Sequence, residues 1–193
     1  YDAIGKIHGV AVCKLLGGKG KERIPVYASG GYLTHDPDNQ LQAQLERVAD
    51  RHGEKVSQVG WSLGGLYARE MAKERPELAR CVVTLGSPFA GHPRATNAWR
   101  FYEMVSGDDV QEPELIERIR GLPPVPTTSI YSRSDGVVAW QCSLNEDSPL
   151  AENIEVEASH IGMGMNPLAL YAVADRLRQA FDLPGVPIRI ETR

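Results

Sequence analysis

The stretch Val59-Gly60-Trp61-Ser62-Leu63-Gly64-Gly65 decides the fold, because a short apolar run stops there at a serine between glycines and a helix-forming run begins. The pattern Gly-x-Ser-x-Gly is typical of a nucleophile elbow, a tight strand-to-helix turn with the serine at its tip. Glycines at positions 60 and 64 would remove the Cβ atoms that otherwise collide as strand and helix close up. A plain glycine-rich turn is the alternative, since many sequences match so short a pattern by chance.

The residues on either side of this stretch favour the elbow. Lys55-Val56-Ser57-Gln58-Val59 has the composition of a β-strand, and residues 66–75 have that of a helix, which Pro76 would end. A motif of this kind is supported by the elements that surround it. We therefore expect a strand, a nucleophilic serine at position 62 and a helix, in that order.

The totals limit the class of protein. The chain has 193 residues, of which 42% are hydrophobic and 24% charged, as in a globular protein with one domain. Its net charge of −4 gives no general attraction to nucleic acid. No apolar run approaches the roughly 18 residues of a membrane helix. The beginning of the sequence lacks the pattern of a signal peptide, so we expect a cytoplasmic protein.

The cysteines argue against two further classes. Cys13, Cys81 and Cys142 are an odd, widely spaced set without a Cys-x-x-Cys pair. This pattern favours neither a disulfide framework nor a zinc site. Cys81 opens an apolar run and is expected to be a small core residue. We expect no metal ion and no organic cofactor.

Strand and helix patterns alternate through the first half of the chain. We expect strands at 23–28, 55–60 and 80–86, with helices at 37–52 and 63–75 between them. This alternation predicts crossover connections and hence a mostly parallel, doubly wound α/β sheet. Later strands are expected at 127–131 and 153–157, followed by a helix at 167–181. The apolar residues expected to face the sheet from that helix are Leu168, Leu170, Val173 and Leu177.

The segment 88–126 interrupts the alternation. It contains two amphipathic stretches, at about 94–106 and 112–120, and a proline-rich end. An insertion of this length predicts a small helical cap on a single domain that covers residues 1–193. The first stretch carries apolar residues that either line a substrate pocket or fill the core. They are Trp99, Phe101, Tyr102, Met104 and Val105.

A serine hydroxyl is a poor nucleophile at neutral pH, so Ser62 needs an imidazole in reach and a carboxylate that orients this imidazole. His160 lies just past the last expected strand, where an elbow of this type finds its base. The other histidines end a helix, lie in polar loops or precede the serine in the wrong chain order. They are His8, His35, His52 and His92.

Asp135 is the best candidate for the carboxylate. It follows the strand that ends at Tyr131, and Gly136 would let the chain turn sharply behind it. Ser62, Asp135 and His160 would then all lie at carboxyl ends of strands, at one edge of the sheet. Weaker candidates lie in the cap or in a polar loop: Asp108, Asp109, Glu146 and Asp147.

Four blocks together carry a resemblance to a known family. They are Gly60-Trp61-Ser62-Leu63-Gly64-Gly65, Thr84-Leu85-Gly86-Ser87-Pro88-Phe89, Tyr131-Ser132-Arg133-Ser134-Asp135-Gly136-Val137-Val138 and Ser159-His160-Ile161-Gly162-Met163. Residues 23–178 resemble a bacterial alpha/beta-hydrolase of the serine esterase and lipase-like kind. The resemblance implies Ser62 as nucleophile, Asp135 as orienting acid and His160 as general base.

The resemblance also implies an oxyanion hole with a backbone N–H group from Leu63. The second donor is expected from the loop after an earlier strand, and position favours Tyr32, although Gly30-Gly31 replaces the family's usual pair and a plain glycine turn is the alternative. Apolar residues near these blocks are expected to contact substrate, although aromatic residues fill cores as readily. They are Trp61, Trp99, Phe101 and Met163.

The expected activity is hydrolysis of a small-molecule or lipid-like carboxylic ester through an acyl-enzyme. Two alternatives keep the same scaffold. An acyltransferase or thioesterase would use the same three residues with another acceptor or substrate, and a non-catalytic binding protein would use the fold alone. The sequence leaves the acyl chain length and the oligomeric state open.

Overall fold

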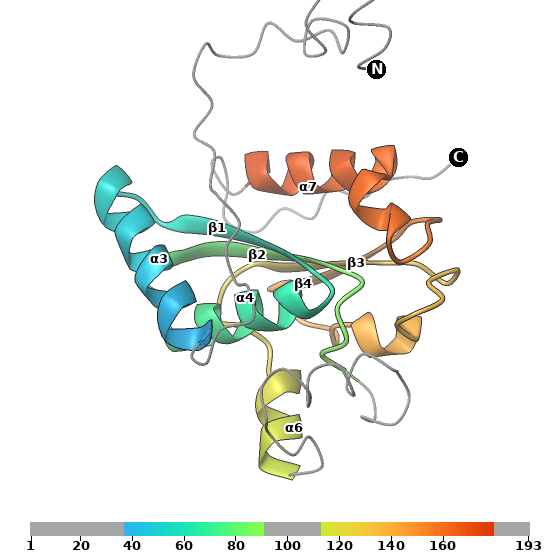
Figure 1. Ribbon diagram of the computed structural model, residues 1–193, viewed down its shortest axis with the longest axis horizontal. Helices are drawn as coiled ribbons and strands as arrows, with labels where there is room; N and C mark the ends of the chain where they lie inside the picture. Colours follow the sequence, from blue (N-terminus) through green and yellow to red (C-terminus); the bar gives the residue numbers. More distant parts are fainter. Residues whose placement is uncertain (1–36, 91–112, 180–193) are drawn as a thin grey trace, which may run out of the picture. The chain divides into compact units, whose positions relative to one another are not determined.

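A computed structural model of the chain describes residues 37–90 and 113–179 (Figure 1). Within these ranges, the helices are α3 (Pro37–His52), α4 (Leu63–Glu74), α6 (Pro113–Arg120), η2 (Trp140–Ser143), η3 (Gly162–Met165) and α7 (Pro167–Gln179). The strands are β1 (Val56–Trp61), β2 (Ala79–Leu85), β3 (Thr127–Tyr131) and β4 (Ala151–Glu155). The four strands and the helices α3, α4, α6 and α7 begin and end within about two residues of the bounds expected from the sequence, whereas η2 and η3 were not expected.

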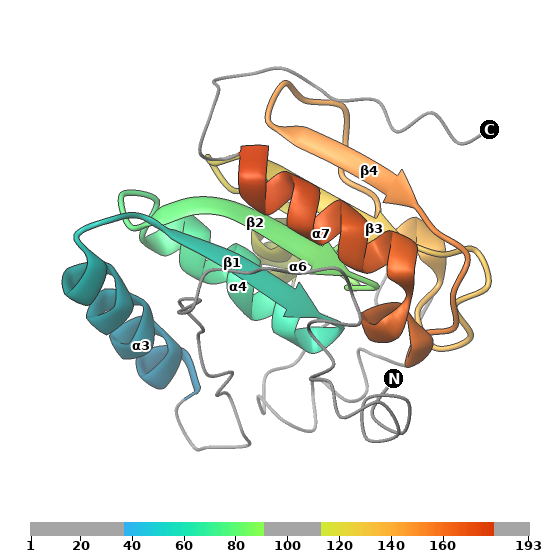
Figure 2. The same ribbon diagram turned by 90° about the horizontal axis from the view of Figure 1, so that it is seen from above.

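The four strands form one parallel sheet in the order β1-β2-β3-β4, and Figure 2 shows their arrowheads pointing the same way. Parallel neighbours need a crossover, which α4 supplies between β1 and β2. The expectation of a parallel α/β sheet is thus confirmed. All four carboxyl ends lie at one edge of this sheet.

Strand β2 is buried on both sides because helices cover both faces (Figure 1). Val82 packs with Ala68 and Ala72 of α4 on one face. Val83 and Leu85 point the other way and pack against α7. Side chains alternate along a strand, so a strand covered on both faces has a continuous apolar run.

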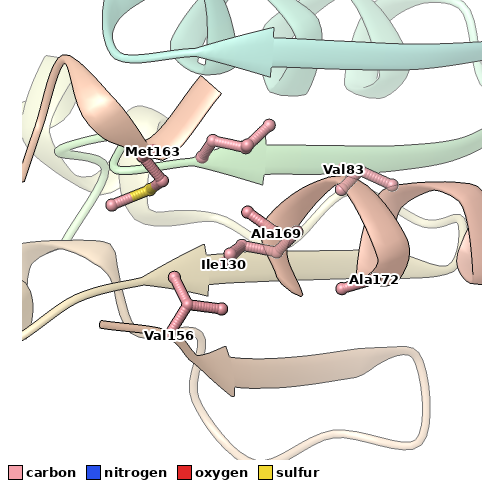
Figure 3. Close-up of a cluster of buried hydrophobic side chains, with 7 residues drawn as sticks. Val83, Ile130, Val156, Met163, Ala169 and Ala172 are labelled. Atoms are coloured by element: carbon pink, nitrogen blue, oxygen red, sulfur yellow. The ribbon is translucent and has the colours of Figure 1, made fainter. Parts of the chain in front are cut away.

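The face that α7 turns to the sheet matches the expectation at Val173, which packs against the core cluster, and differs from it at Leu168 and Leu170. Leu168 and Leu170 are exposed, at 61% and 50%, whereas Ala169 and Ala172 are fully buried. Figure 3 shows both alanines against Val83 and Ile130. Small side chains let a helix lie close to a sheet, and the buried stripe of α7 follows these alanines rather than the leucines.

Strand β4 begins earlier than the expected residue 153, because Ala151 and Glu152 already pair with Thr127 and Thr128. The N–H group of Val156 donates to the carbonyl of Tyr131 at 2.9 Å, so the hydrogen bonding continues just past the strand's assigned end. Cys81 is a buried core residue as expected, with 4% exposure.

Several expected elements fall outside the described residues. They are the strand at 23–28, the loop that contains Tyr32, and the cap stretch at 94–106 with Trp99 and Phe101. The second amphipathic stretch of the expected cap, at about 112–120, lies within the described residues from 113 on and forms helix α6. None of the helices in the described ranges is long and apolar enough to cross a membrane.

Candidate active site

Ser62 occupies a strained turn between β1 and α4. It has φ of 54° and ψ of −123°, and it is the one non-glycine residue with a positive φ in the part of the chain that the structure describes. Such a conformation costs on the order of 1–3 kcal/mol and needs support from its surroundings. The Ser62 N–H group donates to the Leu85 carbonyl at 2.8 Å, and the Gly65 N–H group donates to the Ser62 carbonyl at 3.1 Å.

The glycines around Ser62 have unequal importance. A Cβ at Gly60 would overlap the backbone of Gly64, as expected for an elbow. A Cβ at Gly64 would meet no atom within 4 Å, so the expectation of a collision at this position is wrong. The second tight contact is at Gly65, where a Cβ would overlap the Ser87 side chain. Helix α4 therefore approaches the loop after β2 at Gly65, one residue later than the motif indicates.

The structure brings Ser62, Asp135 and His160 together in one chain of hydrogen bonds. The distance from His160 Nε2 to Ser62 Oγ is 3.0 Å, and that from His160 Nδ1 to Asp135 Oδ2 is 2.7 Å. If Nδ1 carries the proton and donates to the carboxylate, Nε2 is left to accept the proton of the serine hydroxyl. The arrangement is therefore chemically able to activate Ser62.

The Asp135 carboxylate is almost fully buried, with a side-chain exposure of 2%. Its Oδ1 accepts hydrogen bonds from the N–H groups of Val137 at 2.8 Å and Val138 at 2.9 Å. Its Oδ2 faces His160. A buried charge is tolerated when hydrogen bonds satisfy it, and these bonds also fix the direction of the carboxylate. The turn behind Asp135 does not depend on Gly136, which lacks a positive φ and has room for a Cβ.

Gly86, at the end of β2, lies directly against the Asp135–His160 pair. Its φ is +54°, and an added Cβ would lie 3.0 Å from Asp135 Oδ2 and 3.3 Å from His160 Nδ1. Gly86 stands in one of the four blocks that carry the family resemblance, but the sequence alone assigned it no role. Its position just after a buried strand was the available signal.

Two serines that the sequence analysis did not single out join the loop that carries Asp135 to the segment before His160. Ser132 Oγ accepts hydrogen bonds from the N–H groups of Ala158 at 3.1 Å and Ser134 at 3.2 Å. Ser134 Oγ donates to the Ala158 carbonyl at 3.3 Å. The loop that carries Asp135 is thereby fastened to the segment that leads to His160.

Leu63 begins α4, so its N–H group belongs to the first turn, where helix N–H groups have no acceptor within the helix. Such groups, together with the helix dipole, suit a developing negative charge. Tyr32, the expected second donor, lies outside the described residues. Trp99 and Phe101 lie outside them as well.

The other two expected substrate contacts are placed differently. Met163 is fully buried in the core cluster that also contains Val83 and Ile130 (Figure 3). This burial supports a packing role for its side chain. Trp61 is 46% exposed, and its indole ring lies 5.4 Å from the imidazole of His160 between centroids. Trp61 thus lies at the candidate site, in contact with His160.

A buried arginine connects α4, the helix that follows Ser62, to neighbouring segments. Arg69 of α4 donates to Asn145 Oδ1 at 2.7 Å and to the carbonyls of Arg120 and Gly121 that end α6. Its guanidinium lies 3.7 Å from the ring centroid of Phe89. Burial lowers the pKa of Arg69 to about 10, which leaves it charged at neutral pH. Arg69 thereby connects α4 with α6 and with the loop after β2.

No protein-family model matches this chain. The sequence is 29% identical over 176 residues to a pimeloyl-(acyl-carrier protein) methyl ester esterase of Klebsiella pneumoniae (strain 342), which covers 80% of this chain and 63% of that protein. A second protein of that name, from Klebsiella pneumoniae subsp. pneumoniae, is 32% identical over 123 residues, or 58% of this chain and 44% of the other. The chain therefore spans less than two thirds of the length of these curated relatives.

Solved structures of esterases and lipases are similar in fold. Aspergillus fumigatus lipase B has a TM-score of 0.62 at 19% identity, with 83% of this chain and 45% of that chain covered. A monoacylglycerol lipase of Paleococcus ferrophilus has a TM-score of 0.54 at 14% identity, with 74% of each chain covered. The chain has the alpha/beta-hydrolase fold of esterases and lipases, and its sequence is similar to that of an esterase.

Proposed function

We propose that this protein hydrolyses carboxylic esters through an acyl-enzyme formed on Ser62. The observation that carries the proposal is the continuous chain from Ser62 Oγ to His160 Nε2 and from His160 Nδ1 to Asp135 Oδ2, at 3.0 and 2.7 Å. This geometry matches what a general base and its orienting acid require. The similarity to an esterase sequence supports the same reaction class.

In the proposed reaction, Ser62 Oγ attacks the ester carbonyl while His160 Nε2 takes the hydroxyl proton. The carbonyl oxygen becomes an oxyanion, which the N–H group of Leu63 would stabilise, with Tyr32 kept as the predicted second donor. His160 then gives its proton to the departing alcohol. A water molecule repeats both steps on the acyl-enzyme, releasing the acid and restoring Ser62.

The proposed substrate is a small-molecule or lipid-like ester. The relative's name describes a methyl ester of an acyl chain on a carrier protein, so methyl esters of acyl chains are the first substrates to try. We keep the segment 88–126 as a proposed cap over the site, inserted in a single domain.

The test is Ser62→Ala, assayed with a p-nitrophenyl ester of a short acid. Loss of the nucleophile is expected to lower kcat/KM on the order of 10⁴-fold or more, as in other Ser–His–Asp enzymes. Ser148→Ala is the matched control, because Ser148 lies outside the site and its hydroxyl only accepts from the Leu150 N–H group. Equal rates for wild type and Ser62→Ala would refute the assignment of Ser62.

Two further measurements separate the alternatives. A fluorophosphonate probe is expected to label wild type and not Ser62→Ala, whereas a folded but unlabelled wild type would favour a non-catalytic binding protein. Competing alcohol and thiol acceptors added to the assay should leave the free acid as the main product. Transfer of the acyl group to an added acceptor would favour an acyltransferase.

A further inference from the structure

Trp61 and His160 are 99 residues apart in the chain but make two contacts with each other. The indole N–H group of Trp61 donates to the backbone carbonyl of His160 at 3.1 Å. The indole and imidazole rings also lie against one another, with centroids 5.4 Å apart and planes inclined by 35°. One tryptophan side chain therefore contacts both the backbone and the ring of the same histidine.

The location of Trp61 gives these contacts a mechanistic meaning. Trp61 is the last residue of β1 and directly precedes Ser62, whose strained backbone is held by the elbow. His160 lies in the loop between β4 and η3. Strands β1 and β4 are the two outer strands of this sheet, so the loop approaches Ser62 from the side opposite to β1. The indole therefore ties the loop of the base to the strand end that carries the nucleophile.

The hydrogen bond to Asp135 orients the His160 ring, but on its own it does not exclude a shift of the ring relative to Ser62. A shift would change the distance between Nε2 and Ser62 Oγ, which is 3.0 Å. Proton transfer depends steeply on such a distance, and a displacement of about 1 Å can cost on the order of 10²-fold in rate. The hydrogen bond from the indole of Trp61, the residue before Ser62, opposes this displacement directly.

We propose that Trp61 is a positioning residue that sets the distance between His160 and Ser62 through its indole N–H group. The inference rests on the proposed function, because it concerns the base of the same reaction. It assigns Trp61 a role different from the substrate contact that the sequence alone suggested. Trp61 is 46% exposed and so is accessible to a substrate as well, and the two roles make different predictions for kcat and KM.

The sharpest test replaces the indole of Trp61 by its sulfur analogue, 3-benzothienylalanine, which keeps the ring shape and removes the N–H donor. Trp61→Phe and Trp61→Leu complete the series. For the loss of one hydrogen bond we expect kcat to fall about 3- to 10-fold with KM within about twofold. Trp61→Leu also removes the ring contact and is expected to lose on the order of 10²-fold.

A positioning role further predicts that the fold-loss is the same for esters of different acyl chain and alcohol. The rate of labelling by a fluorophosphonate should fall by the same factor, because labelling also needs an activated Ser62. The far-downfield proton resonance of His160 Nδ1–H should shift or broaden in the variants. A substrate contact would instead raise KM selectively for some esters and leave both of the other signals unchanged.

Trp140 provides the matched control, since it is a second partly buried tryptophan that stacks on Tyr131 at 5.9 Å between centroids. Trp140→Phe and the benzothienyl analogue at 140 are expected to keep wild-type kcat. Normal kcat for the benzothienyl variant at 61 in a labelled, active protein would overturn the inference while leaving the proposed function intact. An unlabelled wild type would instead overturn the proposed function.

Discussion

The turn after β1 and the turn after β3 each present one polar side chain at the same edge of the sheet, but they hold it by different means. Ser62 sits at a φ of 54°, and an added Cβ at Gly60 would overlap the neighbouring backbone. Asp135 lies in a turn without a positive φ, and its carboxylate accepts N–H groups from Val137 and Val138. Steric exclusion and backbone strain shape the first turn, and hydrogen bonds to a charged group shape the second.

This difference decides which substitutions each turn tolerates. A turn held by close backbone contact is sensitive to one added methyl group, whatever its polarity. A turn held by hydrogen bonds to a carboxylate is sensitive to the chemistry of that group, and Gly136 within this turn has room for a Cβ. The two turns therefore respond to different mutations.

Asp135→Asn should abolish the proposed orienting role of residue 135 with little change in side-chain volume. The amide keeps an oxygen for the N–H groups of Val137 and Val138, but an NH₂ group facing His160 would favour the wrong tautomer of the imidazole. We expect kcat/KM to fall on the order of 10⁴-fold, as the same change does in other Ser–His–Asp enzymes. Steady-state kinetics measure the effect.

Asp147→Asn is the control for this prediction, because Asp147 is an exposed acid in the polar loop that was a weaker candidate. It should keep wild-type rates. If Asp135→Asn stayed within about tenfold of wild type, the carboxylate would not be the orienting acid, since a wrong tautomer costs far more.

Gly60→Ala should break the first turn through volume alone. The new Cβ would overlap the carbonyl of Gly64, so strand and helix must separate. We expect a loss of about 1–3 kcal/mol in the free energy of unfolding, the usual cost of overpacking, and a fall in kcat/KM on the order of 10²-fold. Chemical denaturation and steady-state kinetics measure both.

Gly64→Ala is the matched control in the same motif, since a Cβ there meets no atom within 4 Å. Alanine in place of a helical glycine should raise the free energy of unfolding by up to about 1 kcal/mol. Comparable destabilisation by both variants would mean that close backbone contact does not shape this turn.

The contrast between the turns also explains what the sequence could predict. Close backbone approach requires glycine at position 60, so the elbow was visible as a motif, and strand ends then pointed to Asp135 and His160. The hydrogen bonds of Ser132 and Ser134 leave no such pattern, because serine is common in loops for many reasons. The parallel sheet was predicted from the alternation of strands and helices, whereas the order of its strands is known only from the structure.

Other features depended on packing that a sequence does not encode locally. Apolar size suggested that leucines of α7 face the sheet, whereas the structure buries Ala169 and Ala172. The contact between Trp61 and His160 joins residues 99 positions apart, so no periodicity indicates it. The tight contact at Gly65 depends on Ser87, which belongs to the next strand's loop.

Gly86 combines both kinds of constraint, because a residue with a φ of +54° lies against a hydrogen-bonded pair. In Gly86→Ala, the new Cβ would lie 3.0 Å from Asp135 Oδ2 and 3.3 Å from His160 Nδ1, close enough to push the pair apart slightly. We expect a loss of about 1–2 kcal/mol in the free energy of unfolding from the left-handed backbone, and a fall of about 10-fold in kcat from displacement of the base.

Gly136→Ala is the control for both contributions, since Gly136 lies beside Asp135 but has neither a positive φ nor an atom within 4 Å of an added Cβ. It should leave kcat and the free energy of unfolding near their wild-type values. If Gly86→Ala lost stability but kept kcat, the glycine would serve the backbone alone. If the kcat of Gly86→Ala fell as expected while Gly136→Ala kept its wild-type kcat, the space that Gly86 leaves next to the Asp135 carboxylate would be what keeps Asp135 and His160 together. A glycine within the loop of Asp135 itself would then not be required.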